Sequence, residues 1–167
     1  MRYTMFASTA KKEGYEQIAA IFLETADQEK EHAKRMFKFL EGGMVEITAM
    51  YPAGKVGTTE ENLIEAAAGE HEEWAIDYPA FAEIAEKEGF KEIAVMYRMI
   101  GKVENMHEDR YKALLARVQS NGVFSREEAI DWQCRNCGFV IKSKVAPKTC
   151  PACLHSQAYF EPLKWNF

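Results

Sequence analysis

The stretch ETADQEKEHAKR, residues 24–35, places Glu29 and His32 three residues apart. The same spacing returns 75 residues later with Glu104 and His107. Residues three apart share one face of an α-helix, so each pair presents a carboxylate and an imidazole together. Both pairs fall on apolar stripes, and the sequence therefore predicts two helices that turn these groups toward one interior.

The two pairs belong to a longer internal repeat. A shift of 75 residues superimposes 10–40 on 85–115 without a gap and places Tyr3 on Tyr78. This offset is too long for the stacking unit of a solenoid, and it favours a duplicated helical hairpin that builds a four-helix bundle. Apolar periodicity predicts helices over 10–40, 60–86 and 90–118.

The predicted helix at 60–86 adds Glu70 and Glu73 on its inward stripe. Four carboxylates in one core cannot stay ionised without cations, because each buried charge is strongly disfavoured. Two metal ions would neutralise them, and oxygen-rich ligation with few imidazoles favours iron or manganese over zinc or copper. The candidate ligands of this dinuclear site are Glu29, His32, Glu70, Glu73, Glu104 and His107.

The repeat also predicts a carboxylate that the sequence does not contain. The partner of Glu70 falls about five residues before Met1, so we expect a shortened first helix. Glu73 or a water molecule would then fill the vacant ligand position. Tyr3 and Tyr78 either donate hydrogen bonds to the ligand carboxylates or are ordinary buried tyrosines with a polar tip.

All four cysteines lie near the C-terminus, as Cys134-x-x-Cys137 and Cys150-x-x-Cys153. Paired knuckles of this kind usually bring four thiolates to a single metal ion. Spacing alone does not separate iron from a structural zinc ion. Iron is favoured here because an electron carrier beside a dinuclear oxidoreductase site has an evident use.

The chain divides into an acidic and a basic part. From Ile130 onward the net charge is +3, whereas the rest of the chain carries −8. The overall charge of −5 argues against nucleic-acid or anionic-membrane partners. No apolar run is long enough to span a membrane and no signal peptide is evident, so a cytoplasmic protein is expected.

Glycine and proline mark the boundaries between these parts. Glycine-rich 42–58 is expected to connect helices across the bundle, and Thr58 or Thr59 to start the next helix. The break at 120–122 separates a predicted bundle domain from a small metal domain, with short strands expected at 139–141 and 158–160. The predicted domains are 1–124 and 125–167.

These motifs closely resemble the rubrerythrin family. The resemblance rests on 24–35, FKFLEGG at 37–43, GEHEE at 69–73, CRNCG at 134–138 and CPAC at 150–153, and it covers nearly the whole chain. It implies a mainly α protein, in which a ferritin-like four-helix bundle precedes a small C-terminal rubredoxin-like β/loop metal domain.

The resemblance also implies roles for the candidate ligands. Glu29 and Glu104 would bridge two non-haem irons, and Glu70 and His107 would serve one of them. Glu73 or His32 would serve the other iron, exchanging as its oxidation state changes. Tyr3 and Tyr78 match the tyrosines that lie beside the ligands in the family.

The implied activity is a non-haem di-iron peroxidase that reduces hydrogen peroxide to water. Electrons would pass through an iron bound by the four cysteines, supplied by a rubredoxin or an NADH-dependent flavoprotein reductase. A homodimer is expected, or a larger assembly, with the tail of one subunit facing the bundle of another. Two alternatives remain: a ferritin-like protein that oxidises or stores iron, and a non-catalytic zinc-ribbon module on a degenerate bundle.

Overall fold

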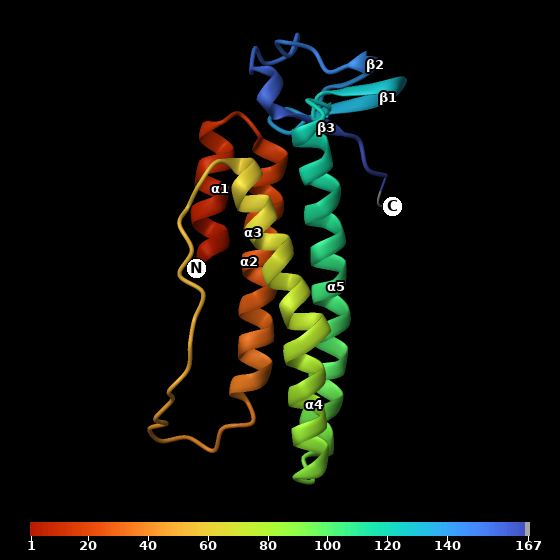
Figure 1. Cartoon of the computed structure of the whole chain (residues 1–167). Coiled ribbons are helices and arrows are strands. Elements are labelled where there is room, and N and C mark those ends of the chain that lie inside the picture. The colour runs from red at the N-terminus through yellow and green to blue at the C-terminus, as the bar shows by residue number, and fades with distance from the viewer. Residues whose placement is uncertain (166–167) are drawn as a thin grey trace.

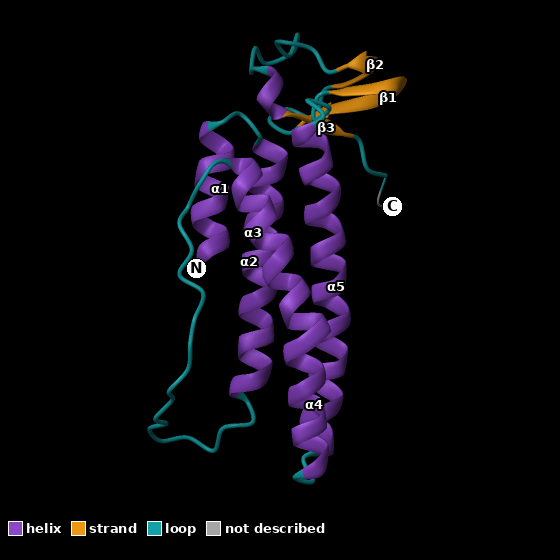
Figure 2. Cartoon of the chain, viewed as in Figure 1, coloured by secondary structure: helices purple, strands orange, loops and turns teal. Residues whose placement is uncertain are grey.

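The computed structural model describes residues 1–165, which form a helical bundle and a small β-sheet module at one end of it (Figure 1). The helical elements are α1 (Arg2–Lys12), α2 (Glu16–Phe37), α3 (Thr59–Glu72), the π-helical segment η1 (Glu73–Asp77), α4 (Tyr78–Lys87) and α5 (Lys91–Gln119). Helices α1 and α2 form one hairpin, while α3, η1 and α4 run on as one rod that packs along α5 (Figure 2).

The helix predicted over 10–40 is wrong at its N-terminal end. Residues up to Lys12 belong to α1, and α2 begins only at Glu16. Gly14 adopts a left-handed conformation (φ +84°) in the turn between them, and Gly89 (φ +89°) does the same between α4 and α5. The two glycines are equivalent in the 75-residue repeat. A left-handed backbone is accessible to glycine at little cost, so the same turn ends the first helix of each hairpin.

Helix α3 begins at a capping box that follows the long connection. The Glu61 N–H donates to Thr58 Oγ1 at 3.3 Å, and the Thr58 N–H donates to Glu61 Oε2 at 2.8 Å. This confirms Thr58 as the predicted start. The connection before it, residues 38–58, runs along the outside of the bundle from one end to the other (Figure 1).

The main core lies in the half of the bundle near the β-module. Phe6, Phe22, Leu63 and Tyr111 are fully buried there, drawn from α1, α2, α3 and α5. A second, smaller cluster of Ala82, Ala85 and Ala94 joins α4 to α5. Within residues 1–165, none of the helices combines the length and apolar character needed to cross a membrane.

The C-terminal module is an antiparallel sheet of order β2-β1-β3, formed by β1 (Ser125–Cys134), β2 (Val140–Val145) and β3 (Phe160–Pro162). Strand β1 lies outside the two strands expected from the sequence. The strand expected at 158–160 is largely wrong, because Gln157–Tyr159 form the 3₁₀ turn η2 and pairing starts at Phe160. Trp132 is fully buried at the centre, where its Nε1 donates to the Ser143 carbonyl at 3.0 Å.

Candidate metal centres

The centre of the bundle brings carboxylates from three helices to one imidazole. Glu29 of α2, Glu70 of α3, and Glu104 and His107 of α5 each place a ligand atom within 4.8 Å of the others. Glu70, Glu104 and His107 are at most 3% exposed. A group of buried carboxylates this close together requires positive charge between them.

His107 directs one ring nitrogen at these carboxylates. Its Nδ1 lies 2.9 Å from Glu104 Oε2 and 3.2 Å from Glu29 Oε1. Its Nε2 lies 2.9 Å from Oε1 of the Gln28 side chain, an acceptor, so the Nε2 proton is donated there. Nδ1 is therefore the nitrogen left to take up a proton or a metal ion.

The short distances at His107 are not well-formed hydrogen bonds. The Nδ1 of His107, both oxygens of Glu104, and one oxygen each of Glu29 and Glu70 are buried without a hydrogen-bond partner among the described residues. Burial lowers the pKa of His107, but the neighbouring Glu104, Glu29 and Glu70 carboxylates raise it to about 11. The carboxylates thus favour a cation in their midst, and the unpartnered atoms that face one another are donors that fit a metal ion.

His32 lies on the other side of the same two carboxylates. Its Nδ1 is 3.1 Å from Glu29 Oε2 and 3.0 Å from Glu104 Oε1, the oxygens that His107 does not face. Each carboxylate therefore offers one oxygen to each histidine. The two imidazole rings stack with centroids 6.2 Å apart. Such an arrangement suits two adjacent cations that share both carboxylates.

Glu73 lies on η1, in the electric field of the same cluster. Burial raises the pKa of Glu73 to about 8, and the charges of Glu70 and Glu29 add to the effect. The π-helical turn that carries Glu73 is a rare feature that often occurs at functional sites. His32 and Glu73 do not belong to the tight group formed by Glu29, Glu70, Glu104 and His107.

The two tyrosines predicted to lie near the ligands differ in their contacts. Tyr3 donates a hydrogen bond from Oη to Glu70 Oε1 at 2.5 Å. Tyr78 stacks on Tyr97 with centroids 5.7 Å apart, and burial, with the charge of Glu73, raises its pKa. Tyr111, a third tyrosine that was not among the predicted site residues, lies fully buried against Tyr3 with ring centroids 5.6 Å apart.

A buried acceptor ties the π-helical segment to α5, and sequence analysis missed it. Glu108, whose side chain is 4% exposed, accepts a hydrogen bond from Trp74 Nε1 and pairs with Lys112. His71, whose side chain is 54% exposed, places Nδ1 3.1 Å from Glu108 Oε1. These contacts hold the backbone next to Glu73 and His107. Helical spacing accounts for its pair with Lys112 but does not reveal Trp74 and His71, which lie on η1 and α3.

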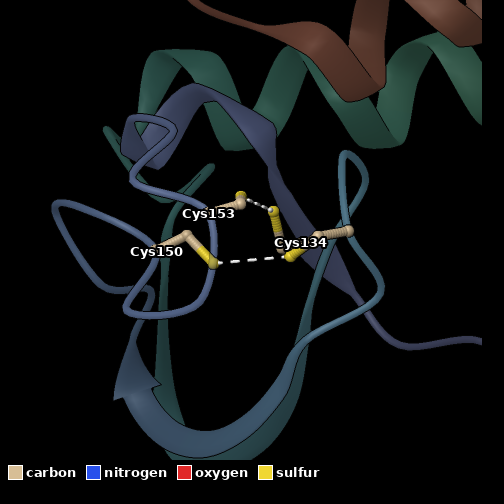
Figure 3. A group of neighbouring side chains, drawn as sticks. Cys134, Cys150 and Cys153 are labelled. Carbon is tan, nitrogen blue, oxygen red and sulfur yellow. Dashed lines mark hydrogen bonds between the residues drawn. The ribbon is translucent and has the colours of Figure 1, made fainter.

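The four cysteines form the second candidate centre. Cys134 faces Cys150 and Cys153 across a common point (Figure 3). The Cys134–Cys153 and Cys137–Cys150 sulfur atoms are both 3.7 Å apart, and all four ligand atoms lie within 4.8 Å of one another. Sulfur atoms about 3.8 Å apart are expected for a tetrahedron with metal–sulfur bonds of about 2.3 Å. All four cysteines are free, so the geometry fits one metal ion.

The two knuckles have the same backbone shape. Gly138 (φ +79°) and Leu154 (φ +61°) each follow the second cysteine of a pair. Their N–H groups donate to the carbonyls of Cys134 and Cys150 at 2.8 and 2.9 Å. The backbone N–H of His155 lowers the pKa of Cys153 to about 6, against the effect of burial. A thiol of this kind is ionised at neutral pH and ready to bind metal.

Comparison with known proteins places both centres in one family. A family model described as Rubrerythrin matches residues 1–115, and one described as Rubrerythrin, rubredoxin-like domain, matches residues 132–161. The chain belongs to the rubrerythrin family. The two matched ranges coincide with the helical bundle and the cysteine module, so membership implies iron binding and an oxidoreductase role.

Individual rubrerythrins are similar over almost the whole chain. The Rubrerythrin of Porphyromonas gingivalis is 70% identical over 166 residues, which cover 99% of this chain and 83% of the relative. The Rubrerythrin of Nitratidesulfovibrio vulgaris is 51% identical, covering 99% of this chain and 87% of the relative. A solved structure of fully reduced, all-ferrous nigerythrin is 28% identical, with a TM-score of 0.61 over 97% of this chain and 78% of that one.

The rubrerythrin assignment confirms the predicted fold class. The mainly α bundle, ferritin-like in architecture, is followed by the three-stranded rubredoxin-like module. Symerythrin from Cyanophora paradoxa, 24% identical with a TM-score of 0.63 over 71% of this chain and 75% of that one, shares the fold. The ligand roles expected for Glu29, Glu70, Glu104 and the two histidines carry forward as proposals.

The metal-free protein is expected to lose stability as the pH rises above neutrality. Contacts with Glu104 and Glu29 raise the pKa of His32 to about 9 from 6.5, although burial opposes them. The stabilising charge of His32 is complete below pH 6.5 and is lost as the pH approaches 9. Glu73 also lowers the stability as the pH rises. Its carboxyl ionises near pH 4.5 in the unfolded chain but only near pH 8 in the folded one, so unfolding becomes more favourable between these two values.

Thermal unfolding in a chelator at several pH values between about 6 and 9 measures this effect. The melting temperature of the metal-free protein should fall, and His32→Gln should flatten the pH dependence. Metal-loaded protein should show little change over the same range, since the metal replaces the protons. A melting temperature that stays level in the chelator would contradict the proposed electrostatics.

Proposed function

We propose that this chain is a peroxide reductase of the rubrerythrin type, which reduces hydrogen peroxide to water at a di-iron site. The observation that carries the proposal is the sharing of Glu29 and Glu104 between His32 and His107. Two histidines that each face one oxygen of the same two carboxylates suit a pair of irons. Bound there, the irons would supply the two electrons and the Lewis acidity for reduction of the O–O bond.

Each ligand has a role in this proposal. Glu29 and Glu104 would be shared by the two irons, and Glu70 and His107 would hold one of them. His32 or Glu73 holds the other. Tyr3 orients Glu70 through its hydrogen bond, while Gln28 fixes the His107 ring so that Nδ1 faces inward. Burial of Glu70 and Glu104 keeps water away from this side of the site.

The C-terminal module is proposed to relay electrons to the bundle one at a time, with the one-electron chemistry supplied by an iron that its four cysteines would hold. The four residues are Cys134, Cys137, Cys150 and Cys153, whose ligand atoms lie within 4.8 Å of one another. A rubredoxin or an NADH-dependent flavoprotein reductase would reduce this module in turn. The charge of +3 from Ile130 onward, against −8 in the rest of the chain, favours docking of one copy's module on another copy's bundle. We therefore propose a cytoplasmic homodimer, or a larger assembly of such pairs.

Anaerobic metal analysis and a single-turnover reaction test this function. About three irons per chain are expected, two in the bundle and one in the cysteine site. The reduced protein should be oxidised rapidly by one equivalent of peroxide, with loss of the ferrous state. Zinc as the only metal, or reduced protein that peroxide does not oxidise, would overturn the proposal. A large hollow particle in solution would favour iron storage instead.

A further inference from the structure

A small cavity lies where α2 and α5 meet the linker to the C-terminal module. Its volume is about 220 Å³. Four cationic residues line it and no acidic residue does, which is unusual in a chain whose net charge is −5. The cations come from α5, from β1 and from the segment after β3, and they are Arg110, Arg117, Arg126 and Lys164.

The charges around this cavity are largely unneutralised. Within residues 1–165, Arg117, Arg126 and Lys164 form no ion pair with a carboxylate. Arg110 is paired with Glu24 at 2.7 Å, but its Nε is buried and lacks a hydrogen-bond partner. Like charges held near each other repel, and the repulsion is strongest where the surroundings are apolar.

Arg126 is held rigidly at the edge of the cavity. One of its guanidinium nitrogens donates to the carbonyls of Gly122 and Ser125, both at 2.7 Å. The guanidinium also lies over the Trp132 ring, 5.2 Å from its centroid. Burial lowers the pKa of Arg126, and the charge of Arg117 adds to the effect. The cation is thus fixed in place before any ligand arrives, which reduces the entropy cost of binding.

We propose that this cavity binds a small anion that carries a phosphate group. Arginine suits phosphate because its planar guanidinium donates two parallel hydrogen bonds. The volume is below the range of about 300–1,000 Å³ typical of pockets for larger ligands, so a single phosphate fits better than a dinucleotide. Ile18, Ile21 and Leu114 form an apolar wall that strengthens the attraction. The bound anion would connect the bundle to the electron-carrying module.

Calorimetric titration of the intact, metal-loaded protein with inorganic phosphate at constant ionic strength tests this proposal. Saturable binding is expected, and Arg117→Gln and Lys164→Gln should each weaken it about tenfold. Both side chains are exposed, so neither substitution should disturb folding. Arg98→Gln is the matched control, because Arg98 lies on the same helix but is paired with Glu86 away from the cavity.

Three results would overturn the proposal. The first is the absence of saturable binding beyond that seen with chloride. The second is equal weakening by Arg98→Gln, which would indicate nonspecific charge attraction. The third is phosphate binding that neither Arg117→Gln nor Lys164→Gln alters, which would assign the ligand to the di-iron site.

Discussion

Glu104→Ala is expected to abolish oxidation of the reduced protein by peroxide while leaving the cysteine-bound iron in place. Glu104 is fully buried, and its two oxygens face His32 and His107 separately. Its removal takes one ligand from each proposed iron position. Loss of residues that merely orient ligands costs about 10–100-fold, so loss of a shared ligand should exceed that range.

Stopped-flow mixing of the reduced variant with peroxide measures the rate of oxidation. The iron content should fall from about three irons per chain to about one. Glu92→Ala is the matched control, because Glu92 lies on the same helix with a side chain 72% exposed and paired with Arg35. The control should react like the unaltered protein. Turnover that persists in Glu104→Ala would show that the reaction does not take place at the bundle centre.

Cys137→Ser is expected to have the opposite effect, with loss of the cysteine-bound iron and retention of the bundle centre. Cys137 is exposed, whereas Cys134 and Cys150 are buried in the module core, so this substitution removes one thiolate with the least loss of packing. The thiolate-to-iron absorption should disappear, because the hydroxyl is a poor substitute for a thiolate. Steady-state peroxide reduction with an upstream donor should fall sharply.

The chemically reduced bundle of Cys137→Ser should still react once with peroxide at close to the unaltered rate. The difference between steady-state and single-turnover rates therefore measures the role of the module as an electron relay. Steady-state rates equal to those of the unaltered protein would show that electrons reach the bundle by another route. Loss of the single-turnover reaction as well would mean that the two centres do not function separately.

Part of the proposed ligand cluster could be predicted from sequence because its members obey helical spacing. Glu29 and His32, like Glu104 and His107, share a face whatever the details of packing. The cysteine knuckles are equally local. The supporting contacts were not predictable: Gln28 reaches His107 and Trp74 reaches Glu108 from different helices. Such pairs depend on how helices are set against one another, which single-chain periodicity does not reveal.

The repeat also overstated the likeness of the two hairpins. Phe6 and Phe81 are equivalent in sequence, yet Phe6 is 1% exposed and Phe81 is 43% exposed. Phe6 packs in a core that includes Leu63 and Ala66 of α3, whereas Phe81 is not part of a buried cluster among the described residues. Burial depends on the neighbouring elements, and equal residue types in two repeats do not ensure equal surroundings.

The π-helical segment η1 has a further consequence for the rod formed by α3, η1 and α4. An α-helix advances by about 100° per residue, whereas the π-helical turn of η1 is wider. The side chains after η1 are therefore rotated about the helix axis relative to a continuous α-helix. Glu70 can thereby aim at Tyr3 while Ala82 and Ala85 meet Ala94 of α5. The two ends of one continuous rod can thus have independent orientations about the helix axis. The chemistry of the centre sets the orientation of the first end, and packing against α5 sets that of the second.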